Sequence, residues 1–242
     1  MWRVDLHTHS VASGHAYSTV AELAEAGAAA GLDAIAITDH GPGLPQGPHV
    51  FHFSNLYRLR EWDGACALLT GVEEDLAGPD GEVYLPERVL EELDIVLVGV
   101  HPYGWAQQQT PAAVTRSLLK AMENPLVRGV THPVNTWMRL DVKEIVKAAA
   151  ATRTAVELNL SKITGLEREL QEFLGWVEEY DAPLMVNTDA HIAAEVGRWE
   201  RAEWLLPLIN PGRVVNRSVE AVCAFFGCAA PRQAASHSKV RT

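Results

Sequence analysis

Short apolar runs recur along the chain, and each is followed by loop residues and then by a segment with helical periodicity. Most of these runs are apolar at every position, which is typical of strands that are covered on both faces. Strands are predicted at residues 4–6, 34–37, 67–72, 95–98, 129–130, 156–158 and 184–186. Strands that alternate with helices in this way indicate a parallel α/β sheet, either open and doubly wound or closed into a barrel.

Capping residues mark the helices between these strands. Ser18 or Thr19 can cap a helix that Gly31 ends, and Pro86 and Pro111 each stand at a helix start. Helices are predicted at residues 20–30, 55–62, 86–93, 110–122, 142–151, 166–180, 196–206 and 218–226. No boundary divides the chain into two domains. Residues 1–228 are therefore predicted to form one domain, with a loose polar tail at residues 229–242.

Composition limits the partners and the compartment. The net charge of −11 argues against long nucleic acids or an anionic membrane as the main partner, but not against a small anionic substrate. The three cysteines include no CxxC pair, so a reducing cytoplasm is expected. The N-terminus does not read as a signal peptide, and no apolar run is long enough to span a bilayer. We therefore expect a soluble cytoplasmic protein; a homo-oligomer is left open.

Histidines and carboxylates gather at the C-terminal ends of the predicted strands. His7 and His9 share a strand face and can bind one divalent metal together, although an HxH pair alone is as often a polar strand end. Seven of the ten histidines lie at such ends, where α/β barrels build their sites. The candidate metal ligands are His7, His9, His15, His40, Glu73, His101, His132, Asp189 and His191.

This ligand set indicates the kind and number of metals. Nitrogen and oxygen ligands without thiolates suit Zn²⁺, Mn²⁺ or Fe²⁺. Nine ligands are too many for one ion and suit two or three. Glu73 shares a strand face with Leu69 and Gly71, so it is expected to point toward the histidines, where its two oxygens can bridge ions. Glu74 is expected to point away, at the surface.

The motifs resemble those of the PHP domain family, named for polymerase and histidinol phosphatase. The resemblance rests on His7-x-His9, His15, Thr38-Asp39-His40, Gly71-x-Glu73, His101, His132-Pro133 and Asp189-x-His191. Residues 5–17, 37–42 and 48–49 are most similar to the YcdX-like phosphatase branch. The resemblance covers about residues 1–228. In one place the chain departs from the branch: residues 187–191 read Asn-Thr-Asp-Ala-His where Ser-Asp-Ser-His is common.

The resemblance implies a distorted seven-stranded (βα)7 TIM-like barrel with three metal ions. By position, the first ion would take His7, His9, Glu73 and Asp189, the second Glu73, His101 and His132, and the third His15, His40 and His191. Zinc is the expected metal, with manganese or iron as alternatives. Glu73 and His132 are the implied catalytic residues, with a metal-held hydroxide as the nucleophile.

The implied activity is a metal-dependent phosphatase that hydrolyses small phosphomonoesters. The chain has no GxSxG motif, P-loop or CxxxxxR loop, which agrees with water as the nucleophile. The alternatives are a histidinol phosphatase and a phosphodiesterase or nuclease for short nucleotides. An amidohydrolase also opens with HxH, but it commonly has a carboxylated lysine at strand 4, where this chain has His101. A barrel that only stores metal is the non-enzymatic alternative.

Several further residues are candidates for substrate contact, each with an ordinary alternative. His49 and His52 could bind substrate or donate a proton, or be plain loop residues. Arg198 and Lys162 could bind phosphate or simply be solvated. Asp5 and Asp39 could orient imidazoles, and Asn159 and Ser161 could reach the rim. Trp105 and Trp137 could line the pocket or only cover the barrel mouth.

Overall fold

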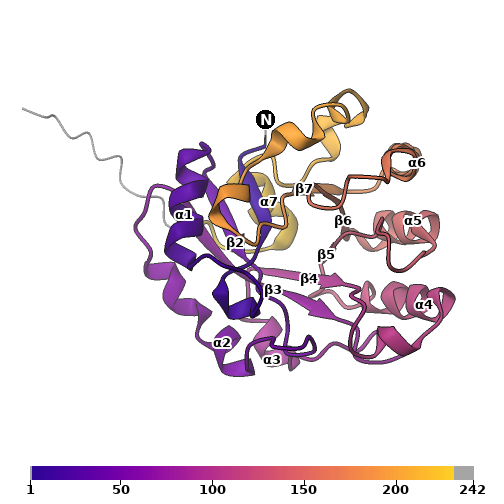
Figure 1. Cartoon of the computed structure of the whole chain (residues 1–242), viewed down its shortest axis with the longest axis horizontal. Coiled ribbons are helices and arrows are strands. Elements are labelled where there is room, and N and C mark those ends of the chain that lie inside the picture. Colours follow the sequence, from indigo (N-terminus) through magenta and orange to yellow (C-terminus); the bar gives the residue numbers. More distant parts are fainter. Residues whose placement is uncertain (1, 232–242) are drawn as a thin grey trace, which may run out of the picture.

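Seven parallel strands form a nearly closed barrel, with helices between them (Figure 1). This is a computed structural model, and it describes residues 2–231. The strands lie in sequence order and are β1 (Val4–Thr8), β2 (Ala34–Ile37), β3 (Ala67–Asp75), β4 (Ile95–Gly99), β5 (Gly129–Val130), β6 (Ala155–Asn159) and β7 (Leu184–Asn187). All seven predicted strands are confirmed, and five of them run one to three residues further at the C-terminal end.

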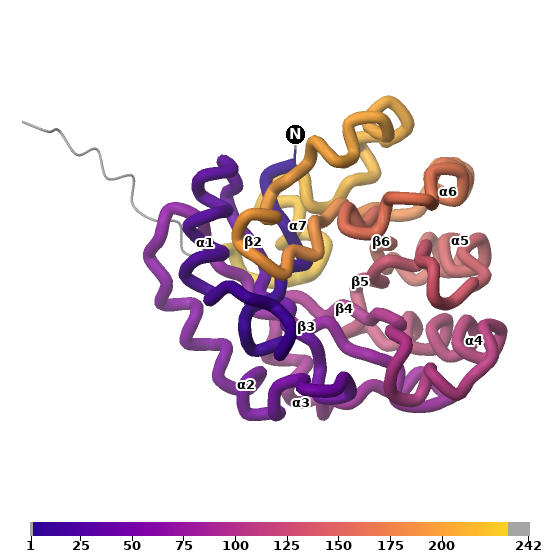
Figure 2. The backbone as a smooth tube through the Cα atoms, in the orientation of Figure 1, coloured from indigo at the N-terminus to yellow at the C-terminus, as the bar shows by residue number. Residues whose placement is uncertain are grey.

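The barrel closes between β1 and β7 through a side chain. Asn216 is fully buried, and its Nδ2 donates to Val4 O at 2.8 Å and to Val186 O at 2.7 Å. Its Oδ1 accepts from Val186 N at 3.1 Å, and Val4 N donates to Asn216 O at 3.3 Å. Figure 2 shows the indigo start of the chain beside its yellow end. The Asn216 side-chain amide thus replaces part of the hydrogen-bond ladder that would otherwise join β1 directly to β7. We call this junction the seam of the barrel.

The helices surround the barrel. They are α1 (Val20–Ala29), α2 (Val50–Ser54), α3 (Glu87–Leu90), α4 (Pro111–Ala121), α5 (Val142–Thr152), α6 (Glu167–Glu179) and α7 (Val219–Phe226). Thr19 and Glu22 form a capping box at α1, and Asp141 and Ser218 cap α5 and α7. Most predicted helices are thus confirmed, with small differences at their ends.

The predicted helix at residues 196–206 is wrong. That region holds short 3₁₀ helices at Ala193–Glu195, Trp199–Ala202 and Leu206–Leu208. Gly197 has φ +69°, and Pro207 removes a helical N–H, so neither supports a continuous α-helix. The predicted helix at 55–62 is likewise a 3₁₀ helix, Leu56–Glu61, preceded by α2.

The barrel interior is divided into an apolar half and a polar half. Val4, Leu6, Leu69 and Leu97 form an inner apolar cluster with Val222 of α7, which covers the N-terminal end of the barrel. The β1–β2 register shifts between residues 5 and 8. This irregularity lets the side chains of both Leu6 and His7 face inward, so the polar half begins directly above the apolar one.

The limits of the domain stay a prediction. Most of the predicted tail at residues 229–242 lies outside the described residues. Within residues 2–231, no helix combines the length and the apolar character that crossing a bilayer requires.

Candidate metal centre

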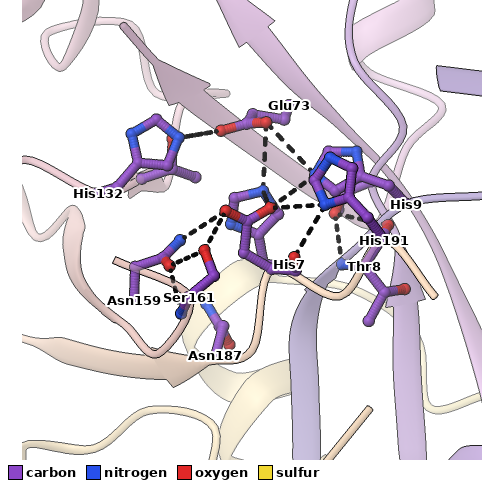
Figure 3. Close-up of polar contacts among 12 residues, drawn as sticks. His7, Thr8, His9, Glu73, His132, Asn159, Ser161, Asn187 and His191 are labelled. Atoms are coloured by element: carbon purple, nitrogen blue, oxygen red, sulfur yellow. Dashed lines mark hydrogen bonds and ion pairs between the residues drawn. The ribbon is translucent and has the colours of Figure 1, made fainter. Parts of the chain in front are cut away.

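Glu73 lies at the centre of the polar half of the barrel, surrounded by imidazoles (Figure 3). Its Oε2 is 3.2 Å from His7 Nε2, 3.5 Å from His9 Nε2, 2.9 Å from His40 Nδ1 and 3.8 Å from His101 Nε2, and its Oε1 is 2.9 Å from His132 Nε2. Both oxygens of this one carboxylate are therefore within reach of different imidazoles, as the strand face predicted.

A glycine leaves the room for this carboxylate. Gly99 faces inward at the end of β4, and a Cβ there would lie 2.8 Å from Glu73 Oε1 and 2.5 Å from Thr131 Oγ1. Thr131 Oγ1 donates to Glu73 Oε1 at 2.6 Å. The hydroxyl of Thr131, directly after β5, and the absence of a side chain at Gly99 on β4 thus fix the position of the Glu73 carboxylate.

Asp189 forms the second anionic point of the site. Its Oδ1 is 3.2 Å from His9 Nε2 and 3.5 Å from His7 Nε2. Its Oδ2 accepts from Asn159 Nδ2, Ser161 Oγ and Lys162 Nζ at 3.1, 2.9 and 2.8 Å. Asp189 has φ +53°, a left-handed conformation that costs energy in a residue with a side chain and is concentrated at functional sites.

The remaining predicted ligands complete one continuous cluster. His191 Nε2 is 3.0 Å from His15 Nε2, and the His15 and His40 rings stack with centroids 5.0 Å apart. The structure therefore brings all nine predicted ligands together. Three overlapping groups have ligand atoms within 4.8 Å of one another: His7, His9 and Asp189; His9, His40 and His191; and His40, Glu73 and His101.

Outer hydrogen bonds aim the imidazoles at the cluster. Glu157 Oε1 is 2.8 Å from His7 Nδ1, and Asp75 Oδ1 is 2.9 Å from His101 Nδ1. Acceptors on one ring nitrogen fix the tautomer and leave the other nitrogen free to bind a metal. Glu157 and Asp75 were not among the residues predicted from the sequence. A carboxylate within the apolar run of residues 156–158 was the available signal for Glu157.

Asp39 acts on the site indirectly. It accepts from Ser13 Oγ at 2.7 Å, and Ser13 Oγ in turn is 3.1 Å from His9 Nδ1. Its other oxygen is 3.0 Å from His52 Nε2. Burial acts to raise the pKa of Asp39, but the interactions with His52, His9 and Ser13 together outweigh it and lower that pKa to about 2. Within residues 2–231, the hydrogen bonds that Asp5 accepts come from the backbone and hydroxyl of Thr188, beside Asp189, and from the backbone of His7, and none comes from an imidazole ring.

The donor set fits divalent cations. Five buried atoms of the cluster have no hydrogen-bond partner among the described residues: His7 Nε2, His9 Nε2, His40 Nδ1, His132 Nδ1 and Glu73 Oε2. Unpaired buried polar atoms are costly, so their concentration at one point indicates a missing partner. Imidazole nitrogens and carboxylate oxygens without thiolate match zinc, manganese or iron.

The pKa shifts of the two carboxylates, Glu73 and Asp189, are consistent with a site for cations. Burial acts to raise the pKa of Glu73, but the imidazoles of His7, His101 and His40 hold it well below its ordinary value. Burial acts in the same direction on Asp189, and His7, His9 and Lys162 hold the pKa of that carboxyl low as well. Both carboxylates are therefore ionised and available to cations at neutral pH.

The predicted substrate contacts have different outcomes. The exposed His49 uses Nδ1 to cap α2 by accepting from Phe51 N, and Arg198 pairs with Glu200 at 2.7 Å; among the residues that the structure describes, neither contacts a ligand of the cluster. Lys162 reaches Asp189, and His52 reaches Asp39.

Glu74 is not at the surface. Its side chain points away from the cluster, but it is fully buried and accepts from Leu85 N at 2.8 Å and Tyr84 N at 3.3 Å. The expectation of exposure was wrong because the β3–α3 connection covers the outer face of the strand at this point.

Comparison with known proteins gives consistent matches. Residues 5–189 match the family model described as the PHP domain. A probable phosphatase of Syntrophotalea carbinolica is 39% identical over 233 residues, 93% of this chain and 95% of the relative. A probable phosphatase of Caldanaerobacter subterraneus subsp. tengcongensis is 36% identical over 225 residues, 90% of this chain and 89% of the relative.

A solved structure shares the fold. Histidinol phosphate phosphatase from Lactococcus lactis, complexed with zinc, L-histidinol and phosphate, matches with a TM-score of 0.58 at 19% identity. The match covers 86% of this chain and 92% of that one.

Proposed function

The chain belongs to the PHP domain family, and on that premise we propose that it is a phosphatase that hydrolyses small phosphomonoesters at a centre of three divalent metal ions. The observation that carries the proposal is the convergence of nine nitrogen and oxygen ligands, Glu73 among them, with five of their buried atoms unpaired among the described residues. The relatives named as probable phosphatases support the same activity.

Zinc is the metal we expect, because imidazole dominates the donor set. The zinc in the Lactococcus structure supports this choice. Ions bound here would supply an activated water at neutral pH and offset the charge of the phosphate oxygens. Glu73 and His132 would be essential, since Glu73 touches five imidazoles and His132 holds its Oε1.

The protein's own residues would orient the phosphate. Burial acts to lower the pKa of Lys162, but Asp189 raises it, so this ammonium stays charged at neutral pH. Its side chain is 32% exposed, so it presents a fixed positive charge to solvent at the edge of the cluster. A phosphate oxygen that approaches the centre would meet this charge.

The test is a panel of esters with purified, metal-reconstituted protein. Phosphomonoesters, including histidinol phosphate, are compared with a diester such as bis(p-nitrophenyl) phosphate. We expect monoester hydrolysis that a chelator abolishes and added Zn²⁺ or Mn²⁺ restores. In ¹⁸O-water the label should enter phosphate and not the alcohol. Turnover of diesters alone would replace the proposal with a phosphodiesterase, and inert esters of both kinds would overturn it.

A further inference from the structure

Trp137 differs in what it contacts from five of the other six tryptophans. Trp199 is buried in the hydrophobic core, and Trp2, Trp62, Trp105 and Trp176 pack against it. Within the described residues, the ring partners recorded for Trp137 are instead His101 and His132. A large apolar ring is thus placed beside the candidate metal centre and not in the core.

The position of this ring is fixed. Trp137 Nε1 donates to Val100 O at 3.0 Å, at the end of β4. The indole lies nearly parallel to the His101 ring, at an interplanar angle of 11° with centroids 6.4 Å apart, and edge-on to His132 at 5.4 Å. A fixed, partly buried aromatic plane therefore forms a wall next to two candidate ligands, at the side of the cluster built by β4 and β5.

Other exposed aromatic rings lie on the connections at the same end of the barrel. Tyr17 follows β1, Tyr84 follows β3 and Tyr103 follows β4, with exposed fractions of 79%, 37% and 48%. Phe51, 72% exposed, lies in the first turn of α2 after β2. Each connection that follows β1 to β5 therefore carries at least one ring that solvent can reach, and the connection after β2 carries a second, Tyr57. A ring that solvent can reach offers a flat contact surface to an aromatic group of a ligand.

The connection after β6 is different in character. It carries Ser161 and Lys162, which hydrogen-bond to Asp189. The rim thus has a cationic part at β6 and an aromatic part at β1 to β5. A substrate with an anionic end and an aromatic end matches this division.

We propose that the alcohol part of the substrate carries a planar aromatic ring that lies against Trp137. The inference rests on the proposed phosphatase activity and names its substrate class. Parallel and edge-on ring contacts are favourable and sensitive to shape. A planar ring should therefore be preferred over a saturated ring of the same size by about three- to tenfold in kcat/KM, mainly through KM.

The experiment compares two esters with similar leaving alcohols. Benzyl phosphate offers a planar ring, and cyclohexylmethyl phosphate offers a saturated ring of similar size, so the ratio of their kcat/KM values isolates the preference for planarity. We expect the ratio to favour the benzyl ester in the wild type, to persist in Trp137→Phe and to approach one in Trp137→Leu. Trp204→Leu, which removes an exposed ring away from these connections, is the matched control and should leave the ratio unchanged.

A measurement without variants guards against misfolding. Benzyl alcohol should inhibit the wild type competitively and more strongly than cyclohexylmethanol. Metal content of each variant is measured in parallel, because Trp137 touches two candidate ligands. A wild-type ratio near one, or a ratio that Trp137→Leu leaves unchanged, overturns the inference while the phosphatase proposal stands. Failure to hydrolyse either ester or any simple phosphomonoester overturns the phosphatase proposal itself.

A separate comparison tests which kind of aromatic ring the substrate carries. Nucleoside 5′-monophosphates are compared with ribose 5-phosphate, which lacks the base. A preference for the nucleotides supports a nucleobase as the ring, and a preference limited to benzyl phosphate supports a simple aryl group. No preference in either pair contradicts the inference.

Discussion

The carboxylates of Glu73 and Glu74, neighbours on β3, lie on opposite sides of one strand and have opposite surroundings. Glu73 faces five imidazoles inside the barrel, and Glu74 faces two backbone N–H groups outside it. Both are buried. The same chemical group therefore serves as a candidate metal ligand at one position and as a structural acceptor at the next.

Glu73→Gln should abolish activity and keep the fold. The amide has the shape of the carboxylate but lacks the charge that opposes the bound cations. We expect kcat/KM to fall roughly a hundredfold or more, beyond the usual effect of an outer hydrogen-bond partner of a metal ligand. Kinetics, metal analysis and circular dichroism together test this. Full activity with normal metal content would rule out Glu73 as a ligand.

Glu74→Gln should alter the pH dependence of stability and leave activity nearly intact. Burial raises the pKa of Glu74 to about 7 from its ordinary value of 4.5. The folded state then holds this proton more tightly than the unfolded chain, so the wild type loses stability as pH rises from about 4.5 to about 7. Glutamine has no such proton to lose.

The measurement is urea unfolding of both proteins across that range. The wild type minus Glu74→Gln difference should decline by up to roughly 3 kcal/mol between pH 4.5 and 7 and be flat above pH 7. Taking the difference cancels the pH dependence of metal binding, which both proteins share. A difference that stays constant across the range would show that Glu74 does not titrate there.

Glu157→Gln should weaken metal binding without removing a ligand. Glu157 Oε1 orients His7, and its Oε2 accepts from His132 N at 2.8 Å. Loss of such a partner commonly costs about 10- to 100-fold in metal affinity. Competition with a chromophoric chelator measures the change. Glu169→Gln, at an exposed site on α6, is the matched control, and equal affinities in the two variants would contradict the orienting role.

Lys162→Met should raise KM for phosphomonoesters, and Arg198→Gln should not. Lys162 keeps its charge beside Asp189, whereas the charge of Arg198 is paired with Glu200. We expect KM to increase by about tenfold in the first variant, the effect of losing one charge-assisted hydrogen bond. Steady-state kinetics decides. The reverse pattern would move the phosphate site to Arg198.

The strands and the metal ligands could be predicted from sequence because both depend on local order. An apolar run marks a buried strand, and residues that directly follow it must lie at its C-terminal end. His15 and His191, in loops, were also counted at strand ends, and only their assignment to a third ion came from the family resemblance. Local order does not predict contacts between segments that are distant in the sequence. Glu74 was predicted to be at the surface because nothing in the sequence reveals that residues 84–85 cover it.

The wrong helix at residues 196–206 and the missed residue Glu157 also have physical causes. The segment at residues 196–206 has helical apolar spacing, but Gly197 and Pro207 favour short turns over that spacing. Glu157 was missed because one charged residue inside a short apolar run does not show which face it occupies. The pairing of β6 with β7 and β5 decides that, and pairing is a property of the whole barrel.

The seam at Asn216 sets the order in which this protein can be made. Its amide bonds to Val4, 212 residues earlier, so the ribosome must translate almost the whole described chain before β1 acquires this neighbour. Until Asn187, Ala190 and Asn216 have all been made, β1 has only β2 as a strand partner and is an open sheet edge, which is a template for association with other chains. The nascent chain is therefore the form of this protein most prone to aggregate, and a stop or frameshift before residue 216 would leave the Val4 end of that edge without the partner that Asn216 supplies.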